Sequence, residues 1–167
     1  MMLKYKPQIS NELTKYHLNQ FTPLLLAIMY QESQGIGNDP MQASESAGLK
    51  RNEINSPEKS IKQGVYHFNK MYKYGKAKRV DLDTIIQSYN MGPGYINFVA
   101  QHGFKNSEKL AKAYSELRVK KSPSTYSCGH NFVNFRYPYC FGDYTYAKKV
   151  KQKMPYIHQI IQKSMSL

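Results

Sequence analysis

The sequence predicts an all-α fold, arranged as one domain over residues 20–167 with an N-terminal extension over residues 1–19. Apolar residues recur every three or four positions along most of the chain, which is the period of a helix with one buried face. No segment alternates strictly between apolar and polar residues, as a half-buried strand would. The hydrophobic fraction of 41%, with 15 tyrosines among 167 residues, suffices for one core and argues against a disordered chain.

Helix start and stop signals are clear in the first half of the domain. Thr22-Pro23 combines a hydroxyl N-cap with proline at the first helical position, and Gly35 and Gly37 end the helix that follows. Ser56-Pro57 is a second start of this kind, and its helix is expected to reach Tyr74-Gly75. Both helices carry apolar residues on the face that a core would bury.

The second half of the domain continues the helical pattern. Asp81 is expected to cap a third helix, a short fourth helix is expected at residues 95–101, and Ser107 precedes a fifth. A sixth helix is expected to begin after Asp143. Pro155 is expected to break or restart it, because proline lacks the N–H that a helix interior needs.

A long irregular loop is expected at about residues 121–142, where glycine, asparagine, proline and aromatic residues are frequent. Its Cys128 and Cys140 are predicted to form a disulfide, which would restrain the unfolded chain by roughly 3 kcal/mol and indicates an oxidising compartment. Free thiols are the alternative. A zinc site would need two ligands beyond these cysteines and only His130 is near, so neither a metal nor a cofactor is expected.

The chain is strongly basic, with a formal net charge of +13 from 24 basic and 11 acidic residues. Such a charge attracts polyanions, either nucleic acid or an anionic cell envelope. Because the basic residues are scattered over several helices, no specific nucleic-acid partner is expected. No apolar run approaches the roughly 20 residues of a membrane span, so an export signal or membrane anchor is expected outside this fragment.

Glu32 is the first candidate for catalysis. It follows an apolar run, residues 23–30, at the end of the first predicted helix. Burial disfavours the charged form of a carboxylate, so an acid in this place is expected to have the raised pKa of a general acid. By composition alone, a solvated glutamate in the last helical turn is the commoner case. Two further carboxylates, Asp39 and Glu45, follow in the next segment.

Four segments of the chain, in order, resemble the motifs of a known superfamily. Glu32-Ser33 followed by Met41-Gln42 resembles the first two motifs of goose-type lysozymes and lytic transglycosylases, and QSYNMG at residues 87–92 resembles the third. The closer resemblance is to the lysozyme-like domain of the CwlT type, which Gram-positive conjugative elements carry. That resemblance rests on DPMQASESAG at residues 39–48, PEKSIKQGV at residues 57–65 and PYCFGDYTY at residues 138–146.

The resemblance implies a lysozyme-like helical domain with a glycan-binding cleft. It implies a cell-wall peptidoglycan hydrolase, a muramidase, which cleaves the β-1,4 bond between N-acetylmuramic acid and N-acetylglucosamine. Glu32 would protonate the leaving oxygen. Asp39 is the better candidate for a second catalytic carboxylate and Glu45 is the alternative candidate, while a loop-capping role is the alternative to catalysis for Asp39. For Glu45 a structural role behind the cleft is favoured over substrate contact. A lytic transglycosylase that forms a 1,6-anhydro ring and a non-catalytic peptidoglycan-binding domain are the alternative functions.

Several other residues are expected on the substrate side of this cleft. Amides suit the acetamido and hydroxyl groups of amino sugars, and tyrosine offers a flat face to a sugar ring. The candidates are Ser33, Gln42, Tyr89, Asn90 and Tyr146, with local hydrogen bonding as the alternative for Ser33 and a core position as the alternative for Tyr146. The expected partners are peptidoglycan glycan strands, anionic wall polymers and a cysteine peptidase domain at the C-terminal side of the full-length protein. The protein is accordingly expected to be secreted or wall-associated.

Overall fold

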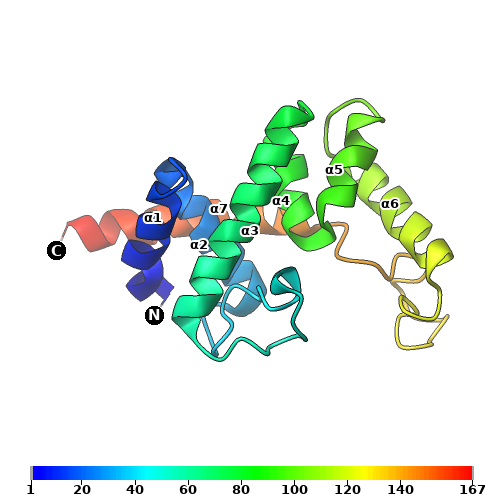
Figure 1. Ribbon diagram of the computed structural model, residues 1–167, viewed down its shortest axis with the longest axis horizontal. Helices are drawn as coiled ribbons and strands as arrows, with labels where there is room; N and C mark the ends of the chain where they lie inside the picture. Colours follow the sequence, from blue (N-terminus) through cyan, green and yellow to red (C-terminus); the bar gives the residue numbers. More distant parts are fainter. Residues whose placement is uncertain (1, 167) are drawn as a thin grey trace. The chain divides into compact units, whose positions relative to one another are not determined.

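The computed structural model describes residues 2–166, which form two compact units (Figure 1). Unit 1 comprises residues 2–70 and 148–166, and unit 2 comprises residues 71–147. The described residues contain seven α-helices, three short 3-10 helices and no strand. The all-α prediction is therefore confirmed.

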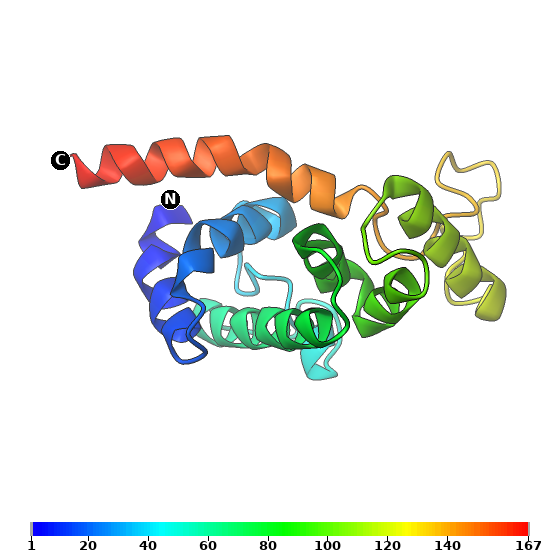
Figure 2. The same ribbon diagram turned by 90° about the horizontal axis from the view of Figure 1, so that it is seen from above.

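Unit 1 is built around α2 (Thr22–Ser33), a helix that is apolar on every side. All six residues from Leu24 to Met29 are buried, because α2 is enclosed by the other segments of its unit. α1 (Lys6–Thr14) lies beside α2 in both views (Figures 1 and 2). The remaining elements of unit 1 are η1 (Met2–Tyr5), η2 (Asn19–Phe21), η3 (Glu45–Ala47), the first part of α3 (Pro57–Ala77) and most of α7 (Tyr146–Met165).

The N-terminal segment is part of the core of unit 1. Ile9 and Leu13, one helical turn apart on α1, are fully buried, and Met2 is also buried. The expected boundary at residue 20 therefore does not separate an extension from the rest of the unit. The apolar face of α1 is only two residues wide, which explains why the sequence pattern did not reveal it.

Unit 2 contains α4 (Leu82–Met91), α5 (Pro93–Ala100) and α6 (Glu108–Lys121), with α4 and α5 side by side (Figure 1). The predicted caps are present: Asp81 accepts a hydrogen bond from the Thr84 N–H at 3.0 Å, and the Ser107 hydroxyl accepts one from the Leu110 N–H at 3.1 Å. An irregular segment then connects α6 to α7, as the sequence predicts.

Two helices continue past the residues expected to end them. α3 passes through Gly75 because glycine is needed there for close packing: a Cβ at this position would lie 2.4 Å from Cγ1 of Ile85. α7 passes through Pro155 without a break, which corrects the expectation of a separate terminal helix (Figure 2). Pro155 is exposed, and the solvent side of a helix accommodates the lengthened hydrogen bonds that proline causes. Within residues 2–166, no helix is both long and apolar enough to span a membrane.

Candidate active site

Glu32 occupies the last turn of α2. The buried side chains of Ile28 and Met29 precede it by one helical turn, so the carboxylate leaves the core at the end of an apolar helix, and the residue is half-buried. The helix ends in a left-handed residue, Gln34, with φ of 59°, whose N–H donates to the Tyr30 carbonyl at 3.1 Å. This placement agrees with the position expected for Glu32 from the sequence, while its chemical role stays a prediction.

Ser33 fastens the end of α2 to the loop that follows. Its hydroxyl donates to the Pro40 carbonyl at 2.7 Å and accepts from the Gly35 N–H at 3.1 Å. The segment after Glu32 is therefore folded back onto the helix end. These are the local hydrogen bonds given above as the alternative to a substrate contact.

Asp39 is buried at the centre of a hydrogen-bond network and is 4% exposed. One carboxylate oxygen accepts from the Ala43 N–H at 2.9 Å and the Ser60 hydroxyl at 2.6 Å. The other accepts from the Ser44 N–H at 3.1 Å and the Ser44 hydroxyl at 2.5 Å. This geometry departs from the expectation of a carboxylate that reaches substrate, because four donors from the protein already surround it.

The two serines extend this network into the surrounding backbone. The Ser60 hydroxyl also accepts from the Met41 N–H at 3.0 Å, and the Ser44 hydroxyl accepts from the Ile54 N–H at 3.0 Å. Asp39 thus ties α3 and the segment before it to the Met41-Gln42 turn. Neither serine was singled out in the sequence analysis, although both lie in segments that carry the resemblance. We name residues 39–44 together with Ser60 the Asp39 network.

The hydrogen bonds of this network control the ionisation of Asp39. Burial by itself raises the pKa of the carboxyl, but the hydrogen bonds from Ser44, Ser60 and the two backbone N–H groups outweigh it. The pKa of Asp39 is therefore lowered below its ordinary value of 3.8. Asp39 is therefore ionised at neutral pH, and oriented donors stabilise its charge.

Gln42 is placed by the same network. Its backbone is left-handed with φ of 45°, a conformation that costs a non-glycine residue about 1 kcal/mol or more. The Gln42 side-chain amide donates to the Asp39 carbonyl at 3.1 Å and to Oδ1 of Asn52 at 2.7 Å. The following carboxylate, Glu45, lies exposed at the first residue of η3. Roles in substrate binding stay predictions for both residues.

The other three candidate residues lie in unit 2. Tyr89 of α4 and Tyr146 at the start of α7 are buried, with exposed fractions of 7% and 2%, and their rings stack with centroids 6.4 Å apart at 4°. Little of either ring is therefore accessible to a ligand. For Tyr146 this is the core position that the sequence analysis gave as the alternative to substrate contact. Asn90 is exposed, and its Oδ1 accepts from the Asp143 N–H at 2.7 Å.

Gln87 is a residue of the third motif to which the sequence analysis assigned no role. It is 1% exposed, and its amide donates to the Asp143 carbonyl at 2.7 Å and accepts from the Ala147 N–H at 3.0 Å. Together with Asn90, it fixes the chain where the irregular segment enters α7. The signal in the sequence that could have revealed this anchoring role is a glutamine directly after Ile85 and Ile86 and one turn before Asn90.

We expect the Gln87→Leu substitution to destabilise the protein by about 2–4 kcal/mol, since the buried Ala147 N–H and the part-buried Asp143 carbonyl lose their partners while side-chain volume is roughly kept. Urea unfolding followed by circular dichroism measures the effect. The matched control is Gln152→Leu on an exposed position of α7, which is expected to change stability by less than about 0.5 kcal/mol. Equal stability of the two variants would show that the Gln87 amide is not needed to hold residues 143–147.

A pocket of about 750 Å³ in unit 1 lies beside the end of α2 and the loop that follows it. Its lining includes Tyr30 of α2, Gln34 and Ile36 of the loop, and Tyr156 of α7. Neither Glu32 nor Asp39 is among the lining residues, so the glycan-binding cleft stays a prediction.

Comparison with known protein families gives a match over most of the chain. The family model described as Lysozyme-like matches residues 1–154. A protein of Bacillus subtilis (strain 168) named uncharacterized membrane protein YocA is 61% identical over 158 residues, which are 95% of this chain and 70% of the relative. Pneumococcal vaccine antigen A of Streptococcus pneumoniae is 34% identical over 158 residues, which are 90% of this chain and 78% of the relative.

Two further relatives are longer than this chain. The bifunctional muramidase/DL-endopeptidase CwlT of Bacillus subtilis is 33% identical over 142 residues, which are 85% of this chain and 42% of the relative. A crystal structure of a Staphylococcus aureus protein, described as similar to a lipoprotein of the NLP/P60 family, superimposes with a TM-score of 0.79 at 35% identity. That match covers 92% of this chain and 52% of the other. These matches bear out the resemblance inferred from the four sequence motifs.

Proposed function

Because the chain belongs to the lysozyme-like family, we propose that it is a peptidoglycan glycosidase whose general acid is Glu32. The proposed reaction is cleavage of the β-1,4 bond between N-acetylmuramic acid and N-acetylglucosamine. The observation that carries this proposal is the place of Glu32: a half-buried acid at the end of a buried helix, followed directly by an ordered polar turn. A relative named as a muramidase supports the choice of substrate.

The first step of the reaction needs an acid. Glu32 would donate its proton to the glycosidic oxygen as the bond to the anomeric carbon breaks and positive charge develops on the sugar ring. The leaving sugar departs with a free hydroxyl, and Glu32 is left as a carboxylate. In a muramidase, water then adds to the anomeric carbon and its proton returns to Glu32, which restores the acid.

We propose that Asp39 serves this reaction by positioning the polar turn. The carboxylate already accepts four hydrogen bonds, so water activation by Asp39 would require the network to open. Its oriented donors instead stabilise the ionised form and the left-handed backbone of Gln42. The sequence analysis favoured direct participation of Asp39 in the reaction. In that case the carboxylate itself would be needed for glycan release, whatever its effect on stability.

The hydrogen-bonded state of Asp39 favours one second candidate function, a lytic transglycosylase. In that reaction no second carboxylate is required: the C6 hydroxyl of the muramic acid attacks the anomeric carbon, and Glu32 takes up the proton of the hydroxyl. The product is a 1,6-anhydro sugar that is lighter than the hydrolysed product by one water. A muramidase and a lytic transglycosylase therefore share Glu32 and differ in the end group they leave.

Digestion of purified sacculi, followed by mass spectrometry of the released fragments, tests the proposal. Fragments with reducing muramic acid ends are expected for a muramidase, and fragments lighter by one water are expected for a transglycosylase. The Glu58→Gln variant is the matched control, because it removes an exposed carboxylate of α3 to which no role in the reaction is assigned. Binding to sacculi without release of fragments over a broad pH range would identify a non-catalytic binding domain.

The basic surface is proposed to hold the enzyme on an anionic cell wall. A net charge of +13 favours binding to phosphate-rich wall polymers, and such binding weakens when salt screens it. Secretion, association with conjugative elements and a cysteine peptidase partner domain stay predictions from the sequence. The disulfide expected between Cys128 and Cys140 is present, in agreement with the predicted oxidising compartment.

A further inference from the structure

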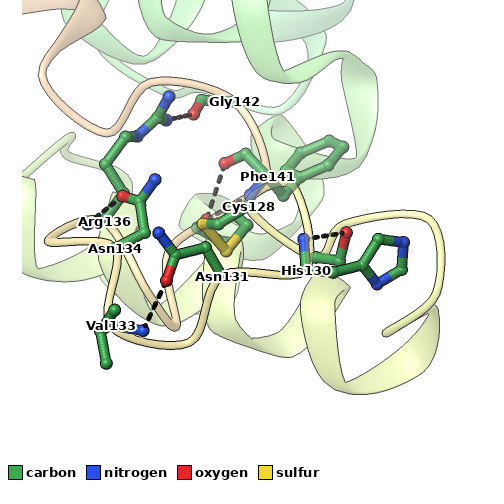
Figure 3. Close-up of a disulfide and its surroundings, with 11 residues drawn as sticks. Cys128, His130, Asn131, Val133, Asn134, Arg136, Phe141 and Gly142 are labelled. Carbon is green, nitrogen blue, oxygen red and sulfur yellow. Dashed lines mark hydrogen bonds between the residues drawn. A yellow bond between two sulfur atoms is a disulfide. The ribbon is translucent and has the colours of Figure 1, made fainter.

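The irregular segment between α6 and α7 is fixed at its base (Figure 3). The disulfide joins Cys128 and Cys140, whose Cα atoms lie 5.1 Å apart. Next to it, the backbone of Phe141 forms two hydrogen bonds with the Ser115 hydroxyl of α6, at 3.1 Å from the N–H and 2.7 Å to the carbonyl. The closed loop therefore projects from an anchored base in unit 2.

The loop is also ordered internally by its own side chains (Figure 3). Oδ1 of Asn131 accepts from the Val133 N–H at 3.1 Å, and Oδ1 of Asn134 accepts from the Arg136 N–H at 2.9 Å. The Arg136 guanidinium donates to the Gly142 carbonyl at the base. These contacts use the amide oxygens of both asparagines to shape the turn.

The outer turn of this loop presents apolar side chains to solvent. Phe132, Val133 and Phe135 have exposed fractions of 68%, 92% and 89%. Three such residues within four positions form an apolar tip, which we call the loop tip. In Figure 3 the Val133 side chain extends away from the disulfide. Exposed apolar residues on protein surfaces are usually isolated. A cluster of them on an anchored turn therefore indicates a surface that binds another molecule or a membrane.

The segment that carries the loop tip has basic residues and no acidic ones. Residues 117–142 contain no aspartate or glutamate, so no acidic side chain of the segment opposes the approach of an anionic surface. The segment carries four basic residues that are charged at neutral pH, Arg118, Lys120, Lys121 and Arg136, of which Lys120 pairs with Glu116 of α6 at 2.8 Å.

We propose that the loop tip inserts into the interfacial region of an anionic phospholipid bilayer. Aromatic and aliphatic side chains are stabilised at the boundary between headgroups and acyl chains, and flanking basic residues are attracted to anionic headgroups. A glycan strand fits the loop tip less well. The rings of Phe132 and Phe135 could face a sugar, but Val133, the most exposed of the three side chains, offers neither a ring face nor a hydrogen-bonding group, and both asparagine oxygens are occupied.

The absence of tryptophan from the sequence provides a direct test of insertion. The Phe135→Trp variant carries a single tryptophan, in the loop tip, which can be excited at wavelengths where the 15 tyrosines do not absorb. We expect its emission to shift to shorter wavelength with vesicles of phosphatidylcholine and phosphatidylglycerol, and lipids brominated on the acyl chains to quench it. With phosphatidylcholine alone or at high salt, the shift is expected to shrink. The matched control is Met165→Trp, an exposed apolar position at the end of α7 that is expected to show neither effect.

A double variant tests whether the apolar side chains cause the binding. Phe132→Ser with Phe135→Ser is expected to reduce cosedimentation with the mixed vesicles by about tenfold or more, because the transfer of two phenyl rings from water is lost. The substituted residues are exposed, so circular dichroism and release of glycan fragments from isolated sacculi are expected to be unchanged. The proposal is overturned if the double variant binds vesicles as the parent does, or if the Phe135→Trp emission shifts with sacculi and not with vesicles.

Discussion

Glu32→Gln is expected to abolish the release of glycan fragments from sacculi while the protein stays folded and keeps its affinity for the wall. Glutamine has nearly the same shape as glutamic acid but has no proton to give to the leaving oxygen. General acid catalysis contributes about 100-fold to 10,000-fold to such a rate, so the loss should be at least of this order. The rate of fragment release, quantified by chromatography of the soluble muropeptides, measures it.

Two further variants make this result specific. Glu32→Asp keeps the acid but draws it back by one methylene, so a strong loss is expected here too, because proton transfer depends on close approach. Glu58→Gln changes the charge by the same amount at an exposed position in the first turn of α3 and is expected to release fragments at nearly the parent rate. If Glu32→Gln keeps more than about a tenth of the parent activity, the general acid is another residue.

The sequence predicted the helices best where short-range signals decide them. Asp81 and Ser107 cap helices in the structure as expected, since capping depends on residues within one turn. α2 begins at Thr22-Pro23, but Thr22 is its first helical residue and not the expected hydroxyl cap: Phe21 is the N-cap, and no side chain caps the helix. The end of α3 was missed because Gly75 serves the packing of Ile85, a contact that no local pattern encodes. α1 was missed because two buried residues, Ile9 and Leu13, give too weak a periodicity.

In the candidate site, too, a feature set by local sequence could be predicted and one set by a distant residue could not. The position of Glu32 at the end of a buried helix follows from the apolar run before it, and the structure agrees. The state of Asp39 does not follow from local sequence, because one of its partners, Ser60, lies 21 residues away on α3. A carboxylate and a distant serine carry no visible relation until the fold places them together.

Asp39→Asn is expected to destabilise the protein by about 2–4 kcal/mol, since an amide can accept at only one of the two positions where the carboxylate oxygens now accept. The amide nitrogen would meet donors of the Asp39 network and leave them without an acceptor inside the protein. Urea unfolding at neutral pH measures the loss. Asp83→Asn, at a half-buried position in the first turn of α4, is the matched control for removal of one negative charge.

The contribution of Asp39 to stability also depends on pH, with a defined sign. The pKa of Asp39 is lowered in the folded protein below 3.8, its value in the unfolded chain, so folding favours the ionised carboxylate. The contribution is therefore complete above about pH 3.8 and is lost as the pH falls through the folded pKa. We expect the parent to lose stability in this acidic range and Asp39→Asn to lose less, which unfolding curves recorded at successive pH values will show.

Comparison of Asp39→Asn with Ser44→Ala and Ser60→Ala distinguishes a positioning role of Asp39 from direct participation in catalysis. These serines donate to the Asp39 carboxylate and also accept from Ile54 and Met41, so their removal loosens the same turn while the carboxylate remains. If Asp39 acts by positioning, glycan release in all three variants should fall in proportion to the stability lost. If Asp39→Asn abolishes release while a serine variant of equal stability stays active, the carboxylate itself takes part in the reaction. We expect the first outcome, because four donors hold Asp39 away from solvent and direct participation would require this network to open.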